Sequence, residues 1–120
     1  MNPNDIYTRN IDYVAERCNH RISKFINVPT KEFNGVCFIA FEGSITKDLW
    51  NPERDWNQLM LVIDEIEKIE GCSVNIIGTS CEILKKDGDA LVSLCKHDGG
   101  SRLDSVYRCC ADFVNNVALR

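Results

Sequence analysis

The first part of the chain predicts an amphipathic helix over residues 4–26. Apolar side chains recur there at steps of three and four, which places them on one face of an α-helix. They are Tyr7, Ile11, Val14, Cys18, Ile22 and Phe25. The helix should end before Val28-Pro29, because the residue that precedes a proline is disfavoured in helical geometry.

A short apolar run follows from Gly35 to Phe41. It is rich in β-forming residues and is bounded by glycines at positions 35 and 43. These features predict a buried strand. For the segment from Ser44 to Trp50 we predict loop or irregular structure.

A second helix is predicted after Asn51-Pro52. Asn51 would be its N-cap and Pro52 its first residue, a position that proline favours. An apolar stripe then runs to Gly71, which should end the helix. The stripe consists of Trp56, Leu59, Met60, Ile63, Ile66 and Ile69. Trp56 is therefore expected in the core, whereas Trp50 either covers the preceding turn or stacks on a ligand.

Three short β-rich runs come next, at residues 72–77, 80–85 and 90–95. Turn residues separate them, which indicates an antiparallel meander. Ser101 then opens a last helix as its N-cap. The order α-β-α-β-β-β-α predicts a single α+β domain over residues 1–120. Its antiparallel sheet of three to four strands would be sandwiched by the amphipathic helices.

Composition narrows the classes of function. The 120 residues are 44% hydrophobic and 27% charged, as in ordinary globular domains. A net charge of −4 argues against binding long nucleic acid, which needs clustered Lys and Arg. No apolar run approaches the ~18 residues of a membrane span, and the polar start is unlike a signal peptide. We therefore expect a cytoplasmic protein without a membrane partner.

The chain carries seven cysteines, an odd number that would leave one outside any disulfide framework. No C-x-x-C pair is present, so the spacing does not suggest a zinc site. Reduced thiols that pack as small apolar groups are the favoured interpretation. We predict no metal and no cofactor.

The clearest family pattern runs from Asp55 to Glu67, through the meander, to Ser105-Val106-Tyr107 and Asp112-Phe113-Val114. It resembles small phage and prophage proteins of the phage ABA-sandwich type. In those proteins a helix with a W-x-x-L-M-x-V-V-x-K-I-E-like signature precedes the strands, and the closing helix has a V-Y-x-x-x-x-x-F-like signature. The resemblance covers residues 50–118, and the acidic run at residues 64–67 departs from it where a basic residue is usual.

The resemblance implies a fold and a biological setting more than a chemistry. A phage-encoded protein would act in the host cytoplasm. Some small phage proteins of similar build are sponges that sequester the nucleotide signals of host immunity. By analogy, the resemblance implies an anti-defence role of that kind.

The first candidate ligand-binding segment is a glycine-containing loop that leads into the last helix. Free amides and the positive end of the helix dipole can hold a phosphate there. The candidate residues are Lys96, His97, Gly99, Gly100, Ser101 and Arg102. The alternative is that the two glycines only turn the chain and the serine only caps the helix.

The second candidate segment surrounds Asn51-Pro52. One of the two indoles, Trp50 or Trp56, could stack on a base. Arg54 could hold its phosphate, and Asn57 or Gln58 could read a base edge. The alternative is that both tryptophans only pack.

We predict no catalytic residues. His97 and Ser101 are too close in sequence for a triad, whose members converge from separate segments. The sequence therefore favours a non-enzymatic binding protein for a small phosphate-bearing ligand, such as a nucleotide signal. An alternative is an interaction or assembly module that binds a host or phage protein. In both cases we expect a homo-oligomer.

Overall fold

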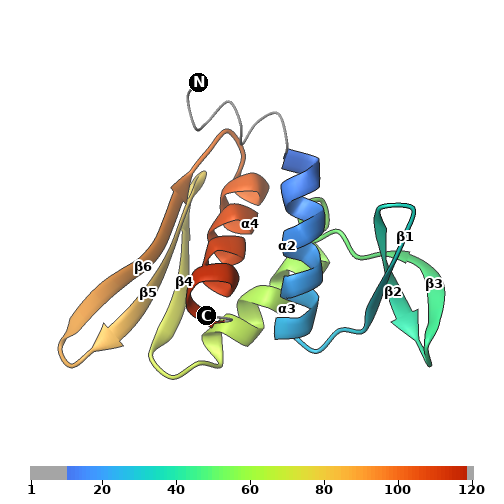
Figure 1. Cartoon of the computed structure of the whole chain (residues 1–120). Helices are drawn as coiled ribbons and strands as arrows, with labels where there is room; N and C mark the ends of the chain where they lie inside the picture. Colours follow the sequence, from blue (N-terminus) through green and yellow to red (C-terminus); the bar gives the residue numbers. More distant parts are fainter. Residues whose placement is uncertain (1–10, 119–120) are drawn as a thin grey trace. The chain divides into compact units, whose positions relative to one another are not determined.

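The computed structural model describes residues 11–118 of the chain, which are drawn in colour in Figure 1. The chain divides into two compact units, Met1–Trp50 and Asn51–Arg120. The single domain over residues 1–120 stays a prediction. Among the described residues, no helix is long and apolar enough to cross a membrane.

The first unit contains one helix and a three-stranded antiparallel sheet. The elements are α2 (Ile11–Phe25), β1 (Thr30–Phe33), β2 (Val36–Phe41) and β3 (Ser44–Leu49). The predicted strand at β2 is confirmed, as is the described part of the first helix; its residues 4–10 lie outside the described range. The prediction of irregular structure after residue 43 is wrong, and β1 was not predicted.

Two tight turns explain the additional strands. Asn34 and Gly35 have φ angles of 53° and 78°, and Glu42 and Gly43 have φ angles of 51° and 82°. Two successive residues with positive φ form the turn whose twist matches that of paired strands. Each turn therefore folds the chain back on β2, with β1 on one side and β3 on the other.

Trp50 anchors the end of β3 to α2. Its side chain is 2% exposed, and its indole Nε1 donates a hydrogen bond of 2.8 Å to the Asn19 carbonyl oxygen. Its backbone amide donates to the Cys37 carbonyl at 2.9 Å. A second link joins α2 to β1, since the Ser23 and Thr30 hydroxyls lie 3.0 Å apart. Trp50 is therefore a core residue of the first unit.

One face of this sheet is apolar. Side chains alternate along a strand, so Val36, Phe38 and Ala40 share a face of β2. Their cross-strand partners are Phe33, Leu49 and Ile45, respectively, and Lys31 also lies opposite Phe38; the register to β3 shifts between Phe38 and Ala40. Phe33 is 60% exposed, and Val36, Ile45 and Leu49 are also exposed. This face leaves more apolar surface open than scattered side chains would.

The second unit contains an antiparallel meander of order β4-β5-β6 and its helices. Its elements are α3 (Trp56–Glu67), β4 (Cys72–Ile77), β5 (Ser80–Asp87), β6 (Ala90–Asp98), α4 (Arg102–Phe113) and the π-helical turn η1 (Val114–Ala118). α4 lies along one face of the sheet, against β5 and β6 (Figure 1). The predicted α+β class, with its meander and amphipathic helices, is confirmed.

The core of this unit forms between β5 and α4. Cys81 and Ile83 of β5 are fully buried, as are Val106 and Cys110 of α4. α4 starts where the sequence predicts, because the Ser101 hydroxyl accepts a hydrogen bond of 3.1 Å from the Asp104 amide. A side-chain cap of this kind satisfies an amide that has no partner within the helix.

The start of α3 differs from the prediction. Asp55 is the N-cap, and its carboxylate accepts from the amides of Asn57 at 2.9 Å and Gln58 at 3.3 Å. The backbone amide of Asn51 instead donates a hydrogen bond of 2.7 Å to the Gln58 side-chain oxygen Oε1. The helix therefore starts at Trp56.

The buried face of α3 also differs from the predicted stripe. It consists of Leu59, Val62, Ile63 and Ile66. Trp56 lies at the edge of this stripe and at the first position of the helix, and it is 36% exposed. Its predicted place inside the core is wrong, because the end of the helix opens to solvent.

Candidate functional site

One hollow in the second unit is lined by Trp56, Ile76 and Arg102. Its volume of about 580 Å³ lies within the range of ligand sites in proteins. Trp56 is the first residue of α3, Arg102 is the first residue of α4, and Ile76 belongs to β4. Three elements that are distant in sequence therefore supply an aromatic, an aliphatic and a cationic wall.

The position of Arg102 is fixed by the turn between β4 and β5. Its Nε donates a hydrogen bond of 2.8 Å to the Gly78 carbonyl. This bond occupies the Nε–H, and the terminal Nη groups can still donate to a ligand. A planar guanidinium held in this way can bind a phosphate or a carboxylate through paired hydrogen bonds.

Both helices begin at the hollow. The Asp55 cap fixes the first turn of α3 and with it Trp56, while Ser101 caps α4. The first-turn amides of Arg102 and Leu103 have no intrahelical acceptor, as in any α-helix. The positive ends of the two helix dipoles add to the charge of Arg102.

This combination suits a ligand with a planar ring and an anionic group. A partly exposed indole offers a face for stacking, which works with any base because every base has a π-face. Ile76 offers an apolar wall beside such a ring, and Arg102 can donate hydrogen bonds to the anion. None of the three lining residues is a nucleophile or a general base.

The predicted residues around Asn51-Pro52 are not brought together as a site. Trp50 is buried in the first unit, so its indole is not available for stacking. Arg54 and Asn57 are exposed near the start of α3, but neither lines the hollow. Of the two indoles, Trp56 is the one that is exposed enough for a ring to stack on it.

The predicted phosphate loop is divided between the two faces of the sheet. Lys96 lies opposite Glu82 and lines a separate hollow of about 230 Å³ with Asn75 and Ile77. His97, the next residue, faces α4 and is hydrogen-bonded to Asp112. Neighbouring residues of a strand point to opposite faces, so these two side chains cannot hold one ligand.

The two glycines of this loop have different roles. A Cβ on Gly99 would lie 3.0 Å from the Ser105 hydroxyl and 3.3 Å from an Asp104 carboxylate oxygen. Gly99 therefore lets the loop approach α4 closely, whereas a Cβ on Gly100 would meet nothing within 4 Å. With Ser101 used as the cap, Arg102 is the residue of the predicted loop that lines the 580 Å³ hollow.

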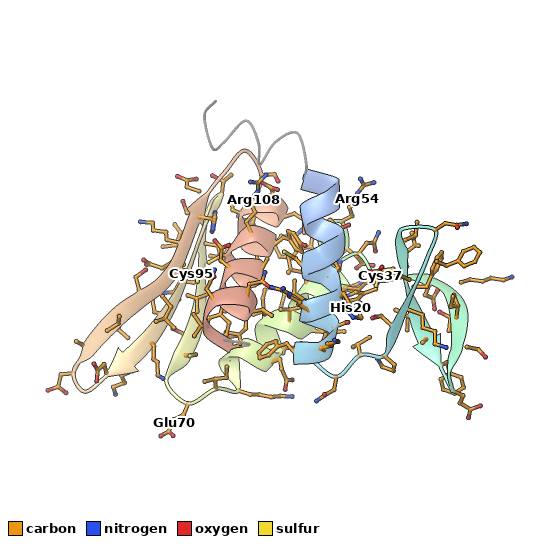
Figure 2. The ribbon with its side chains drawn as sticks, viewed as in Figure 1. His20, Cys37, Arg54, Glu70, Cys95 and Arg108 are labelled. Carbon is orange, nitrogen blue, oxygen red and sulfur yellow. The ribbon has the colours of Figure 1, made fainter. Side chains whose placement is uncertain are left out.

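A cluster of thiols lies on the α4 side of the sheet, where Figure 2 shows Cys95 on β6. Burial, together with Cys109 and Asp112, raises the pKa of the Cys95 thiol to about 11. A hydrogen bond with Cys81 raises the pKa of Cys109, and burial raises that of Cys110. These thiols keep their protons at neutral pH, so proximity to His97 and Asp112 does not produce an activated nucleophile.

Metal and disulfide chemistry find no support in residues 11–118. Within this range, no group of three or more His, Cys, Asp or Glu side chains is arranged to hold a metal ion. No disulfide joins any of the cysteines there.

Comparison of the chain with protein-family models, with curated proteins and with solved structures finds no match. The resemblance to phage ABA-sandwich proteins therefore stays a prediction. Ile76 was not predicted to line a site, and Trp56 was expected in the core. The available signal was Asp55, a strong N-cap residue that places an aromatic side chain at the exposed start of a helix.

Proposed function

We propose that this chain is a non-enzymatic binding protein that captures a small phosphate-bearing ligand at the hollow of Trp56, Ile76 and Arg102. The observation that carries the proposal is that an open indole and a positioned guanidinium line the same 580 Å³ hollow. In keeping with the resemblance, the ligand is a nucleotide signal of host defence, sequestered in the cytoplasm of the host cell.

The electrostatics support a small ligand over a long polyanion. The chain has a formal net charge of −4, so a long phosphate backbone would meet repulsion over most of the surface. A single cationic side chain that is held close to a ligand acts locally against that net charge.

The test is native mass spectrometry of the protein isolated gently from bacterial cells that carry nucleotide-signalling defence. We expect a co-purifying mass of nucleotide size on the wild-type protein. Arg102→Gln should abolish it, while Lys96→Gln should retain it. The two variants remove the same charge, but Lys96 lines a different hollow.

A ligand-free wild-type spectrum under these conditions would contradict the proposal. Equal loss of the ligand from both variants would assign the effect to net charge and refute the hollow as the site. Circular dichroism of each variant shows whether the fold is retained, since Arg102 also binds the Gly78 carbonyl.

A second candidate function is protein interaction, and the observation that favours it is the apolar face of the first unit's sheet. Phe33, Val36, Ile45 and Leu49 expose apolar surface there. The predicted homo-oligomer would also use a surface of this kind. Sedimentation velocity of the wild type and of Phe33→Ser tests this. A wild type that stays monomeric, and that captures no specific protein from lysate, would refute it.

A further inference from the structure

A second hollow of the meander lies on the face of the sheet that points away from α4. Its volume is about 230 Å³. It is lined by Asn75, Ile77, Ser80, Cys81, Glu82 and Lys96. Neighbouring residues of a strand point to opposite faces, so Glu82 points away from the core that Cys81 and Ile83 form with α4. For the same reason Ile77 points away from Ile76, and the two hollows are separate sites.

A row of three polar side chains crosses this face of the sheet. Asn75, Glu82 and Lys96 lie directly opposite one another on β4, β5 and β6. Ser80 and Ile77 belong to the next row, and Ile77 is 78% exposed. Directly opposite residues of an antiparallel pair have Cβ atoms about 4.5–5.5 Å apart. The strand register therefore places a carboxylate beside an ammonium group, with an amide, a hydroxyl and an apolar side chain around them.

The fold itself does not use these polar groups. Within residues 11–118, the side chains of Asn75, Ser80, Glu82 and Lys96 form no hydrogen bond or ion pair with the rest of the chain. Glu82 is half-buried. Its carboxylate has therefore lost part of its contact with water without gaining a partner, and a bound cationic group would offset that cost.

The charges on this face of the sheet are balanced. Glu82 and Lys96 have opposite signs and both line the hollow. The other charged side chains that the strand register places on this face are Asp98, opposite Ser80, and Lys86, opposite Leu91. They also have opposite signs. A ligand with a single charge would be attracted by one lining group and repelled by the other, whereas a ligand with both charges finds a partner for each.

We propose that this hollow is a second binding site, and that its ligand is a small zwitterion, namely a free α-amino acid with an apolar side chain. The ammonium group of the ligand binds Glu82, its carboxylate binds Lys96, and its side chain packs on Ile77. Asn75 and Ser80 can donate and accept further hydrogen bonds. The volume of about 230 Å³ lies below the ~300 Å³ of sites for larger ligands, so it suits a molecule of this size.

The test is a titration of isotope-labelled protein followed by NMR, which detects weak binding residue by residue. The probes are L-leucine and two analogues with a single charge. One is 3-methylbutylamine, which lacks the carboxylate, and the other is 4-methylpentanoate, which lacks the ammonium group. We expect leucine to cause saturable amide shifts in residues 75–82 and 96. Each analogue should bind roughly tenfold more weakly, because it loses one charge-assisted hydrogen bond.

Substitutions of the two charged residues should show which group of the ligand each one binds. Glu82→Gln and Lys96→Gln should each weaken leucine binding roughly tenfold. Glu82→Gln should not weaken 4-methylpentanoate, and Lys96→Gln should not weaken 3-methylbutylamine, since the lost partner is not used by that analogue. The matched control is Lys85→Gln, which removes an exposed lysine from the other face of β5. It should leave leucine binding unchanged, and the amide spectrum of each variant shows whether the fold is retained.

Three results would overturn the proposal. The first is a wild type in which leucine causes no saturable shift in residues 75–82 and 96, including the case in which the shifts occur at Trp56 and Arg102 instead. The second is binding of either analogue as tight as that of leucine. The third is an equal loss of leucine binding in Lys85→Gln and Lys96→Gln, which would assign the effect to net charge.

Discussion

The two tryptophans should differ strongly in their contribution to stability. Trp50→Ala removes a side chain that is 2% exposed, together with its hydrogen bond to the Asn19 carbonyl. Such truncations of buried aromatic residues destabilise proteins by about 3–5 kcal/mol, because a cavity is left behind. Trp56→Ala removes a side chain that is 36% exposed and borders an open hollow. We expect no more than about 2 kcal/mol there, from lost apolar burial alone.

The assay is urea denaturation followed by circular dichroism at 222 nm, which does not depend on the deleted indole. Equal m-values are required before the free energies of unfolding are compared. Trp50→Phe and Trp56→Phe then leave one tryptophan each. Trp50 should emit at shorter wavelength and resist acrylamide quenching, and Trp56 should emit at longer wavelength and be quenched.

Equal destabilisation by Trp56→Ala and Trp50→Ala, or an exchange of their emission properties, would contradict these places for the two side chains. Either result would indicate that Trp56 is buried in the core, as the sequence pattern alone predicts.

Three further predictions concern single contacts of the second unit. Ser101→Ala should lower the free energy of unfolding by about 1 kcal/mol and Ser101→Gly by less, as urea denaturation will show; equal effects would argue against the cap. Burial raises the pKa of Cys95 to about 11 from an ordinary value of 9.0, so the unfolded chain loses this proton first. The free energy of unfolding should therefore fall between pH 9 and pH 11, and less so in Cys95→Ala; an identical pH dependence in both proteins would contradict this. His97→Gln and Asp112→Asn should show a coupling energy of about 1 kcal/mol in a double-mutant cycle without changing ligand binding, whereas strictly additive effects would exclude the hydrogen bond.

Local signals were enough to predict most of the second unit. Ser101 as a cap, the turns at Gly78 and Gly88, and the apolar stripe of α4 each act within a few residues. The pattern therefore predicts the meander and α4 correctly, with β5 and β6 extending beyond the predicted ends, whereas α3 differs in its start and in its buried face.

The first unit shows where weak apolar patterning misleads. β1 and β3 carry charged residues and have little apolar alternation, so they do not look like strands on their own. Their signal lies in the turns, because Asn34-Gly35 is a strong hairpin pair and Glu42-Gly43 adopts similar angles. Weighing the turns above the strands would have predicted both hairpins.

The candidate site was only partly predictable. Arg102 could be identified as a candidate because it follows a helix cap. Its meeting with Trp56 and Ile76 depends on how three separate elements pack. β6 extends to Asp98, beyond its predicted end. Side chains alternate along a strand, so Lys96 and His97 point to opposite faces of the sheet.

The central claim is that the hollow of Trp56, Ile76 and Arg102 binds a small phosphate-bearing ligand. The most direct measurement is a fluorescence titration of the Trp50→Phe protein, whose remaining tryptophan is Trp56, with 3′,5′-cyclic AMP. We predict a saturable change in Trp56 emission that is lost on adding Arg102→Gln and kept on adding Lys96→Gln. No saturable change, or a change that Arg102→Gln leaves intact, would contradict the claim.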